Sequence, residues 1–419
     1  MTDTFHPSSG GTGCRKVRLA YLVSHPIQYQ APLLRRIALE PDVDLTVLFG
    51  SDFSVRGYKD RGFGVEVAWD TPLLDGYRSE FLRPFRDTGE VSPTTPISRG
   101  IFGRLQQRDG SPAFDALWVH GYASVNSLQA ILAANALGIP VLLRAESWLA
   151  DRVRSPWKLV LKKAFFRLLG KGIAAVLPIG TVNAAYWSHY FGTSVPQFLM
   201  PYAVNNRYFA DLTAAAAPRE QELRAELGLS ADRPVILFAS KLQQRKHADH
   251  LLEAYSRLIA DSTPQDRPYL VVVGDGEQRA QLEAQAQQLG LEDVRFAGFR
   301  NQSELPRFFQ LADVFVLPSR HEPWGLIVNE AMASGCPVIV STDVGCHADL
   351  ITNGVEGWVF PVGDIGALAQ ALQQVFSTPE TPAKMGEAAA RRITTWTYEE
   401  DVQGLRRALS AVTRLTKDW

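Results

Sequence analysis

Short apolar runs alternate with segments of helical period along most of the 419-residue chain. In the first half, the runs that are typical of buried strands cover residues 16–24, 45–50, 114–121, 140–147 and 174–180. Amphipathic stretches separate several of them, and the one at 124–138 ends in a glycine suited to a helix terminus. Because parallel strands need helical crossovers, this rhythm predicts an α/β fold with a doubly wound parallel sheet.

The rhythm lapses over residues 206–233, where proline and charged residues predict a linker with one helix. It restarts with apolar runs at 234–240, 268–276, 293–299, 312–319, 337–342 and 357–364. We therefore expect two Rossmann-like domains, at 15–205 and 234–382, that face a cleft; ligands of such sheets bind beyond the carboxyl ends of the strands. Helices over 383–419 are expected to pack back toward the first domain, and residues 1–14 to form a disordered tail.

The composition is that of a soluble globular protein, with 46% hydrophobic residues, 21% charged residues and a net charge of −1. This balance argues against a nucleic-acid partner, which calls for a basic excess. The three cysteines (Cys14, Cys336 and Cys346) lack metal-ligand spacing and favour a reducing compartment. No apolar stretch reaches the roughly 18 residues of a membrane span, and residues 1–14 lack the apolar core of a secretory signal. We expect a cytoplasmic protein.

The segment "HEPWGLIVNE" (321–330) places two glutamates eight positions apart across the start of a predicted helix. A strand ends near Pro318, and "GLIVNEAMASG" predicts a helix that is closed by Gly335. The first backbone N–H groups of a helix have no intrahelical partner and favour an anion. Glu322 projects from the turn, and Glu330 is expected to face the same cleft. Because carboxylates accept hydrogen bonds from vicinal hydroxyls, the sequence predicts a ligand with hydroxyls on either side of a phosphate, as in a nucleotide sugar.

The stretch "PSRHEPWGLIVNEAMASGCPVIVS" (318–341) resembles the E-x7-E signature of the retaining GT-B glycosyltransferases of family 4, also called glycosyl transferases group 1. "GDG" (274–276), "FAGF" (296–299) and "NGVEGWVFPVGD" (353–364) are similar to further landmarks of that family. The resemblance implies the GT-B fold and transfer of a hexose from a UDP-, GDP- or ADP-sugar to an acceptor hydroxyl. The acceptor would be a glycan, a lipid-linked sugar or a small molecule, and the anomeric configuration would be retained.

The resemblance also implies roles for the residues of this motif. Glu330 would hold the ribose hydroxyls of the nucleotide, and Glu322 would hold hydroxyls of the transferred sugar. The residues whose backbone amides would complete the hexose and phosphate site are Trp324, Gly325, Leu326 and Ile327. The turn that would lie against the base consists of Gly298, Phe299 and Arg300.

In the glycosyltransferase family that this chain resembles, basic residues after the first strand of the second domain clamp the diphosphate. The matching segment here, "ASKLQQRKH", contains Lys241, Arg245 and Lys246, which would take that role. Lysine at 241, where arginine is common, makes a point-charge contact instead of a bidentate one. These fixed cations would stabilise the charge of the departing diphosphate, so no metal ion and no cofactor other than the donor is expected. The Asp-x-Asp at Asp42–Asp44 precedes an early strand and receives no ligand role. "VVVGDGEQR" lacks the third element of a dinucleotide fingerprint, because Arg279 stands there.

The acceptor site is expected in the first domain, at the carboxyl ends of its strands. His25 and Gln28 follow the first strand, in a loop without the glycines that are common in the family resembled. His120 ends another strand, and Arg144 and Glu146 flank a position where that family frequently has a histidine. The acceptor candidates are therefore His25, His120, Arg144 and Glu146, although a lone histidine is more often a structural hydrogen-bonding residue.

Residues 157–171 carry five basic residues and no acidic ones. The apolar residues of this helical pattern share one arc, which consists of Trp157, Leu161, Ala164, Phe165 and Leu168. Either the arc packs on the sheet and the lysines are solvated, or it lies on an anionic membrane as an interfacial helix. The second alternative would suit a lipid-linked acceptor.

Other functions are compatible with the same pattern. A nucleotide-sugar epimerase or a phosphorylase could share the architecture, and an epimerase would need no acceptor. A scaffold could bind a nucleotide sugar without turnover, but the presence of Glu322, Glu330, Lys241 and Lys246 together argues against lost activity. The simplest alternative treats the two glutamates and the basic loop as solvated surface residues.

Overall fold

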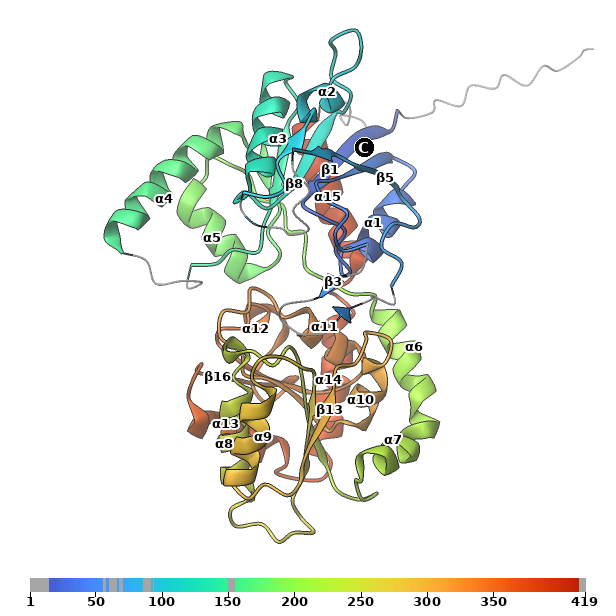
Figure 1. Cartoon of the computed structure of the whole chain (residues 1–419), viewed down its shortest axis with the longest axis vertical. Coiled ribbons are helices and arrows are strands. Elements are labelled where there is room, and N and C mark those ends of the chain that lie inside the picture. The colour runs from blue at the N-terminus through green and yellow to red at the C-terminus, as the bar shows by residue number, and fades with distance from the viewer. Residues whose placement is uncertain are drawn as a thin grey trace, which may run out of the picture.

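The computed structural model describes residues 15–55, 58–59, 66–67, 71–85, 92, 94–149 and 155–413. It has two α/β lobes stacked along the long axis, with the N-terminal domain above the C-terminal domain in Figure 1. Each lobe is built on one six-stranded sheet, so the predicted pair of Rossmann-like domains is confirmed. The tail predicted for residues 1–14 lies outside the described residues.

The sheet of the N-terminal domain is parallel throughout, in the order β10-β9-β8-β1-β2-β5. Its strands are β1 (Val17–Val23), β2 (Val43–Phe49), β5 (Arg78–Phe81), β8 (Ala116–His120), β9 (Val141–Arg144) and β10 (Ala175–Val176). Its helices are α1 (Ala31–Ala38), α2 (Ile101–Leu105), α3 (Val125–Ala136), α4 (Pro156–Leu169) and α5 (Thr181–Phe191). The strand predicted over 174–180 shrinks to two residues, because β10 is an edge strand and Pro178 cannot donate to a ladder.

Among the described residues of this domain, four short strands lie outside this sheet. They form two antiparallel pairs, β3 (Tyr58–Lys59) with β4 (Glu66–Val67), and β6 (Arg83–Pro84) with β7 (Ser98–Arg99). None of them belongs to the sheet that positions the cleft.

The sheet of the C-terminal domain is also parallel, in the order β13-β12-β11-β14-β15-β16. Its strands are β11 (Val235–Ala239), β12 (Tyr269–Val273), β13 (Val294–Gly298), β14 (Val314–Leu317), β15 (Val338–Ser341) and β16 (Gly357–Phe360). Its helices include α8 (Ala248–Ile259), α9 (Arg279–Gln288), α10 (Leu305–Leu311), α11 (Leu326–Ala333), α12 (His347–Leu350) and α13 (Ile365–Val375).

Both sheets have the Rossmann strand order, with the first strand of each domain next to the fourth. The chain direction across the sheet therefore reverses between β1 and β8, and again between β11 and β14. Loops at the carboxyl ends of these strands diverge at the reversal and leave a crevice for a ligand. A cavity of about 770 Å³ between the domains is lined by Gln28 and Arg35 on one side and by Gln302 on the other.

The segment predicted as a linker with one helix is part of the C-terminal domain. It forms α6 (Asn206–Ala216) and α7 (Glu220–Leu227), joined by the short 3-10 helix η2 (Ala217–Arg219). Phe209 and Leu223 are buried in the core beneath β11 to β15, because α6 presents an apolar face to α10 and α11, and α7 presents one to α10. The connection between the domains thus ends before residue 206.

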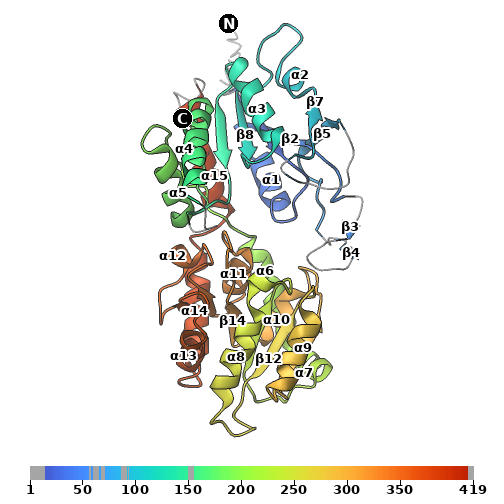
Figure 2. The ribbon, with the colours of Figure 1, turned by 60° about the vertical axis from the view of Figure 1, so that its left-hand side comes forward.

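The C-terminal helices divide between the two domains, unlike the single unit expected for 383–419. α14 (Thr381–Ile393) packs against α11 of the C-terminal domain. α15 (Tyr398–Val412) begins at a capping box made by Thr397 and Glu400 and returns to the N-terminal domain, as Figure 2 shows. There its apolar residues complete the core on one face of the N-terminal sheet.

The helix over residues 156–169 projects from the side of the N-terminal domain (Figure 1). Phe166 and Leu169 pack inward, and Phe165 of the predicted arc is partly buried against the same core. The other residues of the arc face outward, with Trp157 61% and Leu168 70% exposed. Apart from Phe165, the arc therefore does not pack on the domain, and the first of the two alternatives is wrong for these residues.

Candidate functional site

The turn between β14 and α11 is shaped by two residues with positive φ, His321 (55°) and Gly325 (90°). Glycine is required at 325, because a Cβ there would lie 2.8 Å from Cγ1 of Val344. Two backbone hydrogen bonds hold Glu322 in place. Its N–H donates to the carbonyl of Asp343 (3.0 Å), and the carbonyl of Glu322 accepts from the N–H of Gly345 (2.9 Å). The turn thus presents the Glu322 side chain at the carboxyl edge of the sheet.

Basic residues from the end of β11 meet this carboxylate. The 3-10 helix η3 (Gln244–Lys246) follows β11, and the Lys246 amine donates a hydrogen bond to Glu322. The Arg245 guanidinium lies 3.3 Å from the same Glu322 oxygen. Lys246 is buried, and burial lowers its pKa; the charges of Arg245 and Lys241 act in the same direction, while Glu322 opposes them. The structure therefore brings Arg245 and Lys246 against Glu322 at the reversal point between β11 and β14, with Lys241 near enough for its charge to act on Lys246.

The first turn of α11 offers backbone donors beside this cluster. The helix starts at Leu326 without a side-chain cap, so its first N–H groups point toward the same edge. The indole of Trp324 is buried, donates a hydrogen bond to Asn329 Oδ1 (2.9 Å) and stacks on Trp396. Only the backbone of Trp324 is therefore available to a ligand at this edge of the sheet. Leu326 and Ile327 are packed partly against the core through their side chains.

Glu330 is buried one turn further along α11. It accepts a hydrogen bond from Gln302 Nε2 (2.8 Å), and burial raises its pKa to about 7. Gln302 in turn accepts a hydrogen bond from Gln28 of the N-terminal domain (3.0 Å). Glu330 is thereby connected to the opposite wall of the cleft by one intervening side chain.

The turn after β13 carries the three residues that are predicted to lie against the base of the nucleotide. Gly298 ends the strand with a φ of 74°, and Phe299 follows it. Arg300 is engaged within its own domain, since it pairs with Glu226 of α7 (3.1 Å) and with Glu304 (3.3 Å). Sequence reasoning missed Gln302, two residues further on, because an isolated glutamine carries no pattern.

A second network lies at the carboxyl edge of the N-terminal sheet, around Glu146. The Tyr29 hydroxyl donates to its carboxylate (2.7 Å), Tyr202 donates as well, and His120 Nε2 lies 3.7 Å away. Burial alone would raise the pKa of Glu146, but its contacts with His120, Tyr202 and Tyr29 hold that pKa at about 2. Sequence reasoning found Glu146 and His120 and missed both tyrosines, which come from segments far apart in the chain.

His25 lies near this network, at the end of β1. Its Nδ1 is 2.8 Å from Ser24 Oγ, and its ring packs on Phe53. Burial and the charge of His120 lower the pKa of His25 to about 4, so the ring is neutral at pH 7. A neutral imidazole can accept a hydrogen bond from a hydroxyl through one ring nitrogen and donate one to a hydroxyl through the other.

Arg144 does not face the acceptor side of the cleft. It is 2% exposed and forms an ion pair of 3.0 Å with Asp401 of α15, which is 1% exposed. The same guanidinium donates to the carbonyl of Met200 (2.7 Å). Arg144 was predicted to contact the acceptor substrate, but its position gives it a structural role instead. Because a buried guanidinium has lost its contacts with water, it needs the hydrogen bonds to Asp401 and Met200.

Residues 219–392 match the family model described as "Glycosyl transferases group 1". A D-inositol 3-phosphate glycosyltransferase of Streptomyces scabiei is 37% identical over 175 residues, which are 40% of this chain and 39% of that protein. The lipopolysaccharide core biosynthesis glycosyltransferase LpsE of Rhizobium meliloti is 33% identical over 165 residues, 39% of this chain and 46% of that protein. These matches therefore span less than half of the relatives' own length.

Similarity over the whole chain comes from structure. HepE of Anabaena, solved in complex with UDP-glucose, has a TM-score of 0.66 at 18% identity and covers 94% of this chain and 100% of its own. At this identity the likeness defines the fold and no more. The predicted GT-B fold is confirmed, with two parallel-sheet domains on either side of a cleft.

Proposed function

We propose that the protein is a glycosyltransferase that moves a sugar from a nucleotide sugar to an acceptor hydroxyl, with retention and without a metal ion in the reaction. The contact of the buried Lys246 with Glu322 carries this proposal, together with Arg245 beside them. A buried amine against a carboxylate at the start of a helix is a site for a ligand that presents both negative charge and hydroxyls.

The basic residues act on the leaving group. Cleavage of a sugar–phosphate bond leaves negative charge on the diphosphate, and the contacts with Glu322 position Lys246 and Arg245 before the reaction starts. Preorganised positive charge in a water-poor site lowers the barrier without reorganisation. Glu322 would meanwhile hold the sugar hydroxyls, so that the anomeric carbon is oriented toward the acceptor.

Retention follows in this proposal from a single-face reaction. The acceptor hydroxyl attacks the face that the diphosphate leaves, and a phosphate oxygen takes the hydroxyl proton. The bond from the anomeric carbon to the phosphate oxygen breaks as the new glycosidic bond forms, so no separate protein nucleophile is needed.

Glu330 is proposed to bind the ribose of the donor. It is buried at the start of the chain of contacts through Gln302 to Gln28. A nucleoside that displaced Gln302 from Glu330 would give the carboxylate two hydroxyl donors in place of one amide. Because HepE was solved with UDP-glucose, a UDP-sugar is the first donor to test.

The acceptor is proposed to bind at the network around Glu146, His120 and His25. The relatives are named for different products, a D-inositol 3-phosphate glycosyltransferase in one case and a glycosyltransferase of lipopolysaccharide core biosynthesis in another. The family model covers residues 219–392 and does not extend into the N-terminal domain, so we propose that the N-terminal domain determines which acceptor is used.

We also propose that the protein works on the cytoplasmic face of an anionic membrane, with α4 resting on it. In the part of the chain that the structure describes, no helix has the length and apolar character to cross a bilayer. The outward part of the arc on α4 instead combines Trp157, Leu161 (59% exposed) and Leu168 with basic residues on its flanks. Such a helix binds an interface by apolar insertion and by attraction to anionic lipids.

The test is a screen of thermal stability and turnover against UDP-, GDP- and ADP-sugars, in wild type and in Glu322→Gln. We expect one donor class to raise the melting temperature and to be hydrolysed slowly without an acceptor, with hydrolysis reduced in the variant. Stabilisation without turnover under any acceptor mixture would favour a scaffold. Turnover to an isomeric nucleotide sugar would favour an epimerase.

A further inference from the structure

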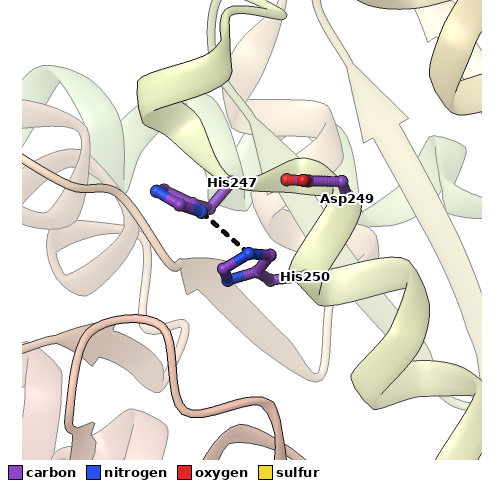
Figure 3. A group of neighbouring side chains, drawn as sticks. All are labelled: His247, Asp249 and His250. Atoms are coloured by element: carbon purple, nitrogen blue, oxygen red, sulfur yellow. Dashed lines mark hydrogen bonds between the residues drawn. The ribbon is translucent and has the colours of Figure 1, made fainter.

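Two histidines and an aspartate converge at the start of α8 (Figure 3). His247 Nδ1 lies 3.2 Å from His250 Nε2, and the ligand atoms of His247, Asp249 and His250 all lie within 4.8 Å of one another. The spacing follows from local geometry, since His247 precedes the first turn of the helix and the other two belong to it.

The separation of the two nitrogens suits a shared metal ion. With Zn–N bonds of about 2.0–2.1 Å, a tetrahedral site has its nitrogens roughly 3.4 Å apart. The carboxylate of Asp249 would need only to swing inward to complete a set of three ligands. Two imidazoles and one carboxylate favour zinc over magnesium, which prefers oxygen ligands.

One hydrogen-bond acceptor of this cluster, an oxygen of the Asp249 carboxylate, has no donor in the described structure. Within the described residues, Asp249 Oδ1 is buried without a hydrogen-bond partner. A buried carboxylate oxygen that lacks a partner carries a desolvation cost, which a cation would offset.

The backbone at His247 is also unusual. Its φ of 52° is a conformation that favours glycine, yet a histidine stands there. The charges that face this residue from neighbouring loops are Arg320, which opposes a cation, and Asp343, which attracts one. Their effects act in opposite directions, so the three ligands decide the affinity.

We propose that His247, Asp249 and His250 form a zinc site that braces the loop carrying Lys246. A bound zinc ion would connect the end of η3 to the first turn of α8, immediately after the residue that contacts Glu322. The site takes no part in bond cleavage, and zinc binding does not depend on the proposed transferase activity. One coordination position would be left for water.

The test uses tag-free, full-length protein that is stripped with a chelator and then titrated with zinc chloride. We expect one zinc ion per chain by calorimetry and by metal analysis after desalting, with a higher melting temperature. His247→Gly and His250→Ala should each abolish the bound zinc. The glycine variant is informative because glycine suits the local φ, so the loop is expected to fold.

His189→Ala is the matched control, because His189 is an exposed histidine on α5 of the other domain. It should leave zinc stoichiometry unchanged, and magnesium chloride should give no binding. The proposal is overturned if stripped wild-type protein binds no zinc, or if His247→Gly and His250→Ala retain it at full stoichiometry. Either result leaves the donor screen unaffected.

Discussion

The two walls of the cleft are built on sheets of the same strand order, yet they hold different chemistry. The C-terminal wall places Arg245 and Lys246 against Glu322, with the charge of Lys241 acting on Lys246, all from loops after β11 and β14. The N-terminal wall places Glu146 in a ring of hydroxyl and imidazole groups. The fold thus supplies two equivalent crevices, and the side chains assign charge recognition to one and hydroxyl recognition to the other.

The two walls also differ in how their residues are held. On the donor wall, an ion pair between Lys246 and Glu322 joins two loops that each connect a strand to a helix, 76 positions apart. On the acceptor wall, Glu146 is held by the hydroxyls of Tyr29 and Tyr202, which lie 117 and 56 positions away. Changes on the first wall should therefore affect the donor step, and changes on the second should affect the use of the acceptor.

The largest expected effect is on the donor wall. Lys246→Ala should lower kcat by about 10²–10³, or roughly 3–4 kcal/mol, because a fixed cation no longer faces the departing diphosphate. Steady-state kinetics with donor and acceptor measure it, with circular dichroism to verify the fold. Lys384→Ala, at an exposed position on α14, is the matched control and should retain wild-type kcat. Unchanged kcat in Lys246→Ala would refute the assignment of the leaving-group site.

The next largest effect is expected at Glu330, where one substitution should change the stability of the fold and the affinity for the nucleotide in opposite directions. Its pKa in the folded protein is raised from 4.5 to about 7, so the folded state holds an extra proton between these values. Wild type should lose stability as pH rises from about 4.5 to about 7, by about 3 kcal/mol in total. Glu330→Gln should remove that slope and be more stable above pH 7, yet bind the nucleotide roughly 10–100-fold more weakly.

Chemical denaturation across this pH range and calorimetric titration with the nucleotide measure the two effects. Glu304→Gln is the control, since Glu304 is a carboxylate of the same domain in an ion pair with Arg300. If Glu330→Gln keeps the wild-type pH slope, the buried carboxylate is not its source.

On the acceptor wall, Glu146→Gln should lower kcat/KM for the acceptor by about 10–100-fold. The substitution removes the negative charge of the Glu146 carboxylate. The pKa of this carboxyl is about 2, so it is ionised at all working pH values. Acceptor-independent hydrolysis of the donor should stay at the wild-type rate. Glu80→Gln, which changes a carboxylate paired with Arg104 on the same domain, is the control. Equal losses of hydrolysis and transfer would mean that the two walls do not divide the reaction.

The smallest effect concerns α4, on the outer side of the acceptor domain. Trp157→Ser should weaken binding to vesicles of anionic lipid by about tenfold, because a large apolar side chain no longer inserts. Sedimentation with vesicles of anionic and of neutral lipid measures it. Leu159→Ser is the control, since Leu159 is exposed on the same helix but lies off the arc. Equal binding of both variants to anionic vesicles would exclude the arc as the contact.

The sequence predicted the donor wall far better than the acceptor wall, for a physical reason. Each residue of the donor cluster lies in a short loop between a strand and a helix, so local patterns locate it. Arg144 was misassigned because its partner, Asp401, lies 257 positions away and no local pattern signals the ion pair. Gln302 was missed for the same reason, as its contacts join two domains.

The fold was predicted from periodicity at the level of domains, whereas its boundaries were not. The apolar faces of α6 and α7 are spaced irregularly around Pro218, so the segment resembled a linker. α4 is the opposite case, since its apolar arc was identified correctly but its orientation could not be. Periodicity defines a face of a helix and does not reveal whether protein covers it.

The return of α15 to the N-terminal domain has a consequence for synthesis. Val402, Leu405, Ala408 and Leu409 belong to the same core as β1 and β2, which leave the ribosome some 380 residues earlier. The N-terminal domain therefore cannot complete its core until α15 has emerged. A premature stop near residue 397 would leave Arg144 buried without Asp401, so a truncation just after the C-terminal domain would damage the N-terminal domain.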